Sequence, residues 1–294
     1  MLTSPESRCH DVEMLGTLEG VTVGHWTDAT ARTGCSVVLL PEGTVASGEV
    51  RGGAPATRDF SLLEPYATVD EVDAVVLAGG SVFGLAAVDG VVRWLEENDR
   101  GIETPGGKVP IVIGLSLFDL AVGDGSVRPT AGDGRGAAES AAADSPCVGP
   151  IGAGTGATVS KWRGPDHLRD SGLGFAIEEH DGLIFAAMIA VNAWGDVTGD
   201  ENSEPDDVVA ADPFTNTTIG VVVTNATMTK ADCQRVARAG HAGLCRAIFP
   251  AHSPFDGDAL VVAATGSNND DWEIRTVVPM ANRVVARAIR SAVG

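Results

Sequence analysis

The segment Leu183–Val191 reads LIFAAMIAV and indicates the fold more strongly than any other stretch of the chain. A continuous apolar run, without alternation, is typical of a strand that is buried on both faces of a sheet. Ala74–Ala78 (AVVLA), Ile219–Thr224 (IGVVVT) and Leu260–Ala264 (LVVAA) have the same character. The sequence therefore predicts several buried strands.

Helical patterns lie between these strands, which predicts an α/β protein. In Val82–Asn98 the apolar residues recur at helical spacing, and Gly101 follows near the C-cap position. The other expected helices are Gly136–Asp144, Thr229–Ile248 and Trp272–Val293, and the other expected strands are Val21–Val23, Cys35–Leu40 and Val109–Gly114.

The composition excludes several classes of protein. Hydrophobic residues make up 44% of the 294 residues, which excludes a disordered chain. The net charge of −20 argues against nucleic acid and anionic membranes as partners. No apolar run reaches the roughly 18 residues of a membrane span, so no membrane partner is expected.

The N-terminal segment and the cysteines predict a cytoplasmic protein. Residues 1–15 mix charged and apolar side chains and lack the apolar stretch of a secretory signal. The cysteines are odd in number and form no CxxC motif or zinc spacing, so reduced thiols are expected at all of them. They are Cys9, Cys35, Cys147, Cys233 and Cys245.

The basic residues are unevenly divided, with three lysines (Lys108, Lys161 and Lys230) against seventeen arginines. An acidic surface with few lysines stays hydrated in concentrated salt, which suggests a salt-adapted protein. The same composition also fits an ordinary acidic protein from a GC-rich genome. The composition leaves both interpretations open.

Two glycine-rich motifs are weak signals for a ligand site. Gly152–Ala157 fits G-x-G-x-x-A, but it lacks a preceding strand and a following helix, so the glycines more plausibly allow close backbone approach than bind a dinucleotide. Gly79–Ser81 lacks the last glycine of a nucleophile elbow, and Ser81 is expected to cap the next helix.

The histidines are scattered and include no HExxH, so no metal and no cofactor are expected.

An acidic linker precedes one of the buried strands. Gly199–Asn216 contains six acidic residues and two prolines and has no apolar periodicity. It ends at Thr217, where the strand Thr217–Thr224 begins. A solvated segment that runs directly into a core strand is a position where backbone cleavage would do little damage.

Six blocks of sequence, taken in order, resemble the P1 family of self-processing peptidases. This family groups D-aminopeptidase/esterases, β-peptidyl aminopeptidases and nylon-oligomer hydrolases. The resemblance spans about residues 16–266. The blocks are GVTVGH (Gly20–His25), RGGAP (Arg51–Pro55) with Thr57 and Arg58, LAGGSVFG (Leu77–Gly84), GAGTGA (Gly152–Ala157) with Lys161, VNAWGDV (Val191–Val197) and NTTI (Asn216–Ile219).

The resemblance implies an N-terminal-nucleophile enzyme that is made as a precursor and cuts itself. The implied cut lies between Asn216 and Thr217, with Thr218 as the competitor shifted by one residue. It would divide a single catalytic domain, 1–294, into chains 1–216 and 217–294. The implied fold is a four-layer α/β/β/α sandwich, assembled as a homotetramer or a similar oligomer.

The resemblance also implies roles for individual residues. Thr217 would be the nucleophile, and its freed α-amine, with a reference pKa of about 7.7–8.0, would be the base for its own hydroxyl. Asn192 matches the family's oxyanion-hole amide, and Lys161 matches a lysine near the nucleophile. Asp256 and Asp258 match an acidic D-x-D pair, although as isolated residues they also fit a β-turn. The sequence departs from the family at Phe118, where some members have a tyrosine.

The expected function is an aminopeptidase or amidase that acts on short peptides, amides or esters with a free amino end. An inactive or unprocessed scaffold of the same fold remains an alternative. An ornithine-type acetyl transferase is a weaker one, because its K-G-x-G-M segment and Ala-Thr junction are missing here.

Overall fold

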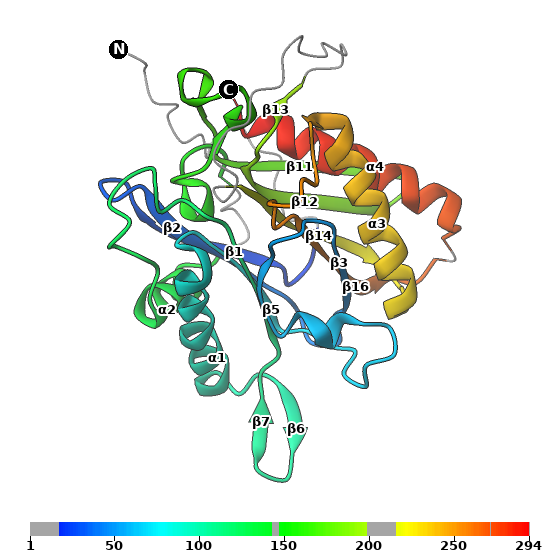
Figure 1. The fold of residues 1–294 in the computed structure, drawn as a ribbon. Helices are drawn as coiled ribbons and strands as arrows, with labels where there is room; N and C mark the ends of the chain where they lie inside the picture. Colours follow the sequence, from blue (N-terminus) through cyan, green and yellow to red (C-terminus); the bar gives the residue numbers. More distant parts are fainter. Residues whose placement is uncertain (1–17, 143–146, 199–215, 271, 294) are drawn as a thin grey trace.

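Two five-stranded β-sheets form the centre of the molecule (Figure 1). The computed structural model describes residues 18–142, 147–198, 216–270 and 272–293. In the first sheet, the central strand β5 pairs antiparallel with β2 and parallel with β8. The strands of this sheet, in spatial order, are β1 (Thr22–Asp28), β2 (Thr33–Leu39), β5 (Ala74–Ala78), β8 (Val112–Ser116) and β4 (Ala56–Arg58).

The second sheet contains the longest apolar strands of the chain. Every residue of β12 and β14 is buried, which is the reason for their continuous apolar sequences. Strand β14 pairs antiparallel with β12 and parallel with β16. The order is β11 (Leu173–His180), β12 (Leu183–Asn192), β14 (Thr217–Ala226), β16 (Ala259–Asn268) and β3 (Val45–Val50).

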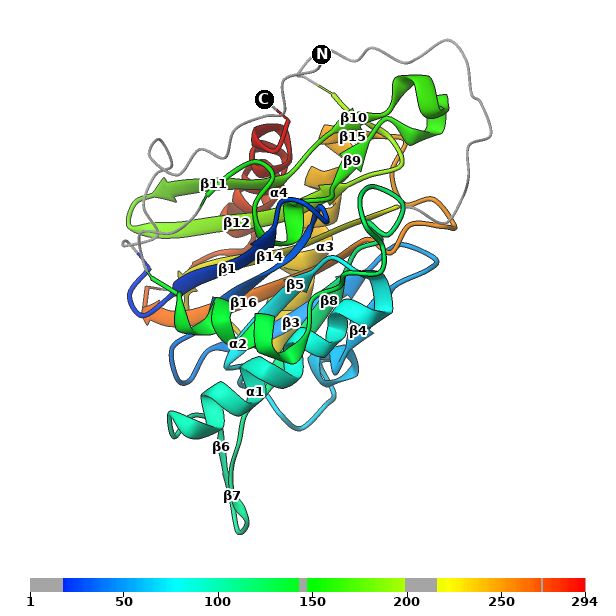
Figure 2. The ribbon, with the colours of Figure 1, turned by 90° about the vertical axis from the view of Figure 1, so that its left-hand side faces the viewer.

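Two pairs of helices cover the outer faces of the sheets. Helices α1 (Ala87–Glu97) and α2 (Ala131–Glu139) lie on the first sheet, and α3 (Lys230–Ala247) and α4 (Ile274–Ser291) lie on the second (Figure 1, Figure 2). One apolar cluster fills the space between each helix pair and its sheet, and a third lies between the sheets. The predicted four-layer α/β/β/α sandwich is therefore confirmed.

Short strands and 3₁₀ helices lie outside the two main sheets. A hairpin of β6 and β7 projects from the body in both views (Figure 1, Figure 2). The short strands are β6 (Ile102–Thr104), β7 (Gly107–Val109), β9 (Thr158–Val159), β10 (Arg169–Asp170), β13 (Asp196–Val197) and β15 (Ile248–Phe249), and the 3₁₀ helices are Phe60–Leu63, Ser81–Ala86, Gly152–Gly154, Lys161–Arg163 and Pro165–His167.

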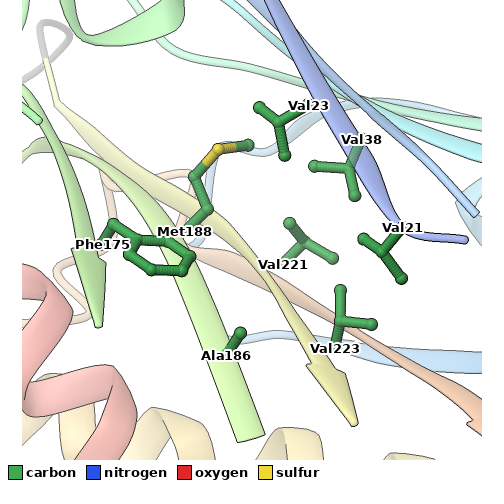
Figure 3. A pocket seen from close by; sticks show the side chains of 8 residues that line it. All are labelled: Val21, Val23, Val38, Phe175, Ala186, Met188, Val221 and Val223. Atoms are coloured by element: carbon green, nitrogen blue, oxygen red, sulfur yellow. The ribbon is translucent and has the colours of Figure 1, made fainter. Parts of the chain in front are cut away.

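The space between the sheets contains a small apolar cavity of about 10 Å³ (Figure 3). A void of this size without polar partners does not hold an ordered water molecule. The cavity is therefore a packing defect of the core, and it carries no chemistry. Its lining comes from both sheets and consists of Val21, Val23, Val38, Phe175, Ala186, Met188, Val221 and Val223.

The helix predicted at Gly136–Asp144 begins earlier than expected. Helix α2 starts after Thr130, whose hydroxyl accepts a hydrogen bond from the Asp133 amide, while the Asp133 carboxylate accepts one from the Thr130 amide. This capping box fixes the start of the helix at Ala131. The strands β3, β4 and β11 were not predicted, because β4 is short and the sequences of β3 and β11 contain glycine and polar residues that interrupt their apolar runs.

The expectation that Ser81 caps a helix is wrong. The 3₁₀ helix begins after Gly80, and the Ser81 side chain makes no cap hydrogen bond to the described residues. Gly80 and Ser81 both have positive φ, 78° and 53°, so the chain turns too sharply for an ordinary N-cap. The close approach expected at Gly152–Ala157 is confirmed, because a Cβ on Gly154 would lie 2.0 Å from the Leu173 amide nitrogen.

The expectation of five reduced thiols is wrong for Cys147, which is disulfide-bonded. Cys35, Cys233 and Cys245 are free thiols. Isolated cysteines with no motif spacing do not reveal which of them the fold brings together. Cys9 and most of the acidic linker, 199–215, lie outside the described residues. Within the described ranges, the structure has no helix with the length and apolar character that crossing a membrane requires.

Candidate active site

The start of β14 is the meeting point of the predicted site residues. Thr217 is its first residue and lies opposite Asn192, the last residue of β12. Strand β16 runs parallel to β14, with Ala259 opposite Ile219, so the preceding Asp256–Asp258 segment reaches the same end of the sheet. The pairing of three neighbouring strands thus brings together residues that are far apart in the sequence (Figure 1).

The Thr217 side chain faces the peptide bond that precedes it. Thr217 is 4% exposed, and its hydroxyl donates a hydrogen bond to the carbonyl oxygen of Asn216. A Cβ on Gly257 would lie 2.7 Å from Thr217 Oγ1. Glycine at this position therefore allows the Asp256–Asp258 loop to approach the hydroxyl closely.

The Asn192 side chain is held in one orientation by three neighbours. Its Oδ1 accepts hydrogen bonds from Lys161 Nζ at 2.6 Å and from the Thr158 amide at 3.0 Å. Its Nδ2 donates to the carbonyl oxygen of Phe118 at 2.8 Å. Because the acceptor end is fixed by two donors, the Nδ2 end must face the opposite direction, toward Phe118.

Lys161 is a buried amine at this site. Its Nζ also donates to the backbone carbonyl of Asn192 at 3.0 Å, and the residue is 7% exposed. Burial lowers the pKa of Lys161 to about 7, against the opposing effect of the charges of Asp256, Asp119 and Asp258. An amine with this pKa can accept and release a proton near neutral pH.

The two acidic residues of the D-x-D pair are equally buried but differently bonded. Asp256 and Asp258 are each 2% exposed. Asp258 Oδ1 accepts a hydrogen bond from the Thr218 amide at 2.7 Å. Asp256 Oδ2 accepts one from the Ser253 amide at 2.6 Å, and burial together with the charge of Asp258 raises the pKa of Asp256 to about 6.

The structure adds residues that the sequence did not single out. Asp119 is 3% exposed and accepts hydrogen bonds from Thr33 Oγ1 and from the Gly80 amide, both at 2.7 Å. Burial raises the pKa of Asp119. The charge of Asp119 raises the pKa of Lys161 and so opposes the effect of burial on that amine. His252 bonds to Asp258. Phe118, which the sequence did single out as the departure from the family tyrosine, takes part through its backbone carbonyl, which accepts a hydrogen bond from Asn192 Nδ2.

The site combines an alcohol, an amine with a pKa near neutrality and buried carboxylates. This set of groups is suited to acyl transfer through a hydroxyl nucleophile. Among the described residues, no group of three or more histidine, cysteine or acidic side chains is arranged to hold a metal ion.

Comparison with known proteins places the chain among peptidases. Residues 14–294 match peptidase family S58. An uncharacterised aminopeptidase of Mycobacterium leprae is 42% identical over 289 residues, covering 85% of this chain and 78% of the relative.

Two solved structures share the fold. A β-aminopeptidase of a Burkholderia species has a TM-score of 0.71 at 17% identity, covering 99% of this chain and 89% of that one. An L-aminopeptidase/D-Ala-esterase/amidase of Ochrobactrum anthropi, a variant of the Ntn-hydrolase fold, has a TM-score of 0.69 at 19% identity, covering 99% and 88%. The chain therefore belongs to peptidase family S58 and is a hydrolase with the fold of these two structures.

Proposed function

We propose that this chain is a self-processing aminopeptidase or amidase whose nucleophile is Thr217. The observation that carries the proposal is the Thr217 hydroxyl, which lies buried against the carbonyl of Asn216. Cleavage of this bond divides the single domain into chains 1–216 and 217–294. The new N-terminus then lies at the start of a buried strand, which holds it rigidly.

The processing step is an acyl shift within the chain. Thr217 Oγ1 attacks the Asn216 carbonyl carbon, the C–N bond breaks, and the hydroxyl proton is transferred to the departing amide nitrogen of Thr217. Lys161, with its pKa of about 7, is suited to accept and return that proton. Water hydrolyses the resulting ester, which leaves a carboxylate on Asn216 and a free amine on Thr217.

Turnover uses the groups that processing sets free. The Thr217 amine accepts the proton of its own hydroxyl, which attacks the substrate carbonyl carbon. The bond to the leaving amine or alcohol breaks, the Thr217 amine returns the proton to that leaving group, and water hydrolyses the acyl-enzyme that remains. Asn192 Nδ2 is the proposed donor to the oxyanion, because Asn192 lies opposite Thr217 on the neighbouring strand and its amide nitrogen carries a second proton besides the one that it donates to the Phe118 carbonyl. Such a donor acts on the charge that develops in the transition state.

The substrates are short peptides, amides or esters with a free, protonated amino end. The supporting observation is the pair of buried carboxylates, Asp256 and Asp258, in the loop next to Thr217. A protonated amine gains attraction from a nearby carboxylate, and acetylation removes that charge. The relative from Mycobacterium leprae and the structure from Burkholderia are both named aminopeptidases, which agrees with this substrate class.

A matched pair of substrates tests the function. The cleaved protein should hydrolyse alanine p-nitroanilide, and N-acetylalanine p-nitroanilide should react at least 10-fold more slowly. Thr217→Ala should be inactive on both. Equal rates on the two substrates would remove the carboxylate anchor, and an active Thr217→Ala protein would remove the nucleophile.

We also propose that the protein is a homo-oligomer, a tetramer or a similar assembly. Large apolar side chains on the surface support this, since Val82 is 60% and Phe83 is 51% exposed. Light scattering after size exclusion measures the mass directly. The disulfide at Cys147 removes the argument for a cytoplasmic location that rested on reduced thiols.

A further inference from the structure

The carboxylate of Asp258 has both oxygens occupied by donors of the protein itself. Oδ1 accepts from the Thr218 amide at 2.7 Å, and Oδ2 accepts from the His252 amide at 3.2 Å and from His252 Nδ1 at 2.8 Å. The residue is 2% exposed. Asp258 therefore fixes the backbone next to Thr217, and it has little capacity left to bind a substrate amine.

Asp256 differs from Asp258 in this respect. Its Oδ2 accepts from the Ser253 amide, but its Oδ1 is buried and has no hydrogen-bond partner among the described residues. An unpaired buried carboxylate oxygen is costly unless a donor binds it. The two carboxylates are thus built for different tasks, and the side chain that makes the difference is His252.

The backbone of His252 and its neighbour His241 hold the His252 ring in one orientation, with Nδ1 directed at Asp258. The φ of His252 is +58°, and its ring packs edge-to-face on His241, with the ring centres 4.9 Å apart. His241 Nε2 lies 2.9 Å from the carbonyl oxygen of Glu49, which only accepts, so this nitrogen carries a proton. Burial lowers the pKa of His241 to about 4, so it adds no charge beside His252 at neutral pH.

We propose that His252 is a positioning residue of the proposed peptidase reaction: as an imidazolium it holds the Asp258 carboxylate in one orientation, so that Asp258 fixes the backbone at Thr218 and Asp256 alone binds the substrate amine. This inference rests on the proposed function of Thr217. It assigns a role to a side chain outside the group of residues that touch substrate.

The charges around His252 support this assignment. His252 faces Asp258, which precedes β16, and it faces His241 and Cys245 on α3. The charge of Arg51, at the end of β3, helps to lower the pKa of His241. Burial alone would lower the pKa of His252, but the hydrogen bond from Nδ1 to Asp258 and the charge of that carboxylate outweigh burial and raise the pKa to about 9. Nε2 is buried and has no hydrogen-bond partner among the described residues. At pH 7 His252 is therefore an imidazolium, and its Nδ1 lies 2.8 Å from Asp258 Oδ2.

The pH profile of His252→Asn tests the proposal. Asparagine tolerates positive φ and places an amide where Nδ1 lies, so the hydrogen bond survives and only the charge is lost. Without the imidazolium, the charge of Asp258 is no longer balanced, so Asp256 holds its proton more tightly. We expect kcat/KM for alanine p-nitroanilide to fall about 10-fold or more at pH 7. The acidic limb should move up by about one pH unit, and the activities should converge near pH 9.

A second histidine variant is the control, and two outcomes for His252→Asn would contradict the proposal. His180→Asn removes an exposed imidazole 3.5 Å from Asp181 and should leave the profile unchanged. A uniform loss at every pH in His252→Asn would show a merely structural role and overturn the proposal. An unchanged profile would overturn it as well.

A second measurement does not need activity. In the uncleaved Thr217→Ala chain, NMR of ¹³C-labelled histidines, with the His252→Asn spectrum for assignment, should show His252 titrating above pH 8. Titration below pH 7 would overturn the proposal while leaving Thr217 as the proposed nucleophile. Conversely, an uncleaved and inactive wild-type chain would remove the proposed function, and the NMR titration would still decide the charge of His252.

Discussion

At the scale of single residues, the site depends on how a few buried polar atoms are paired. Asn192 accepts from Lys161 and Thr158 and donates to Phe118, so one amide links three separate segments. The resemblance to known peptidases identified Thr217, Asn192, Lys161, Asp256 and Asp258. It did not identify Asp119 or His252, because their partners lie far away in sequence or in a loop without a motif. Only the fold shows which of these side chains meet.

Replacement of Asn192 should affect both catalysis and stability. Asn192→Ala should lower kcat by about 10²–10³-fold if the amide binds the oxyanion. It should also lower the free energy of unfolding by about 1–3 kcal/mol, because buried donors and acceptors lose their partner. Enzyme kinetics and urea titration measure the two effects.

Asn225 offers a matched control for this variant. It is also buried, lies near the other end of β14, and bonds to the Ile184 amide and to the Gly182 carbonyl. Asn225→Ala should lose comparable stability and keep its kcat. If Asn192→Ala kept a nearly normal kcat, the oxyanion role would be wrong.

The pH dependence of processing should identify the group that moves the proton. The pKa of Lys161 is lowered to about 7 by burial, so its amine becomes a competent base as the pH rises through 7. Precursor refolded in buffers of pH 5 to 9 should therefore cleave faster with a midpoint near 7, and Lys161→Met should lose this step. A midpoint near 6 that persists in Lys161→Met would point to Asp256 instead.

At the scale of elements, the continuous apolar strands were the predictable part of the fold. Ala74–Ala78 is strand β5 with the bounds expected, and Leu183–Val191 and Ile219–Thr224 lie within β12 and β14. The edge strands β3 and β11 were missed, since half-exposed strands carry polar residues and resemble loops. The predicted position of helix α2 was wrong because the helix starts at a side-chain cap, whereas the prediction relied on the alanine-rich segment that follows it.

Two glycines of α2 should respond in opposite ways to the same substitution. A Cβ on Gly134 would lie 2.0 Å from the Ala87 carbonyl oxygen, so Gly134→Ala must push α2 away from α1. A Cβ on Gly136 would meet no atom within 4 Å. We expect Gly134→Ala to destabilise the fold by about 1–3 kcal/mol and Gly136→Ala to stabilise it by about 0.5–1 kcal/mol. Thermal unfolding of both variants is the measurement, and equal shifts would contradict the packing described for α1 and α2.

At the scale of the whole molecule, the net charge of −20 dominates the behaviour in solution. If the acidic, lysine-poor composition is an adaptation to salt, the melting temperature should rise between low and molar KCl, as screening reduces the repulsion between carboxylates. Differential scanning calorimetry across that range distinguishes the two interpretations. A melting temperature that does not rise would favour an ordinary acidic protein.

We expect self-cleavage to turn one domain into two chains that stay together. Burial of β14 between β12 and β16 does not depend on the Asn216–Thr217 bond, so the fragments should remain associated after cleavage. The most direct measurement is intact mass spectrometry of the purified protein with N-terminal sequencing of the smaller chain. We predict chains 1–216 and 217–294, the second beginning with Thr217, and a single uncut chain for Thr217→Ala. A small chain that begins at any other residue, or a wild-type protein that stays in one piece while hydrolysing its substrates, would contradict the claim.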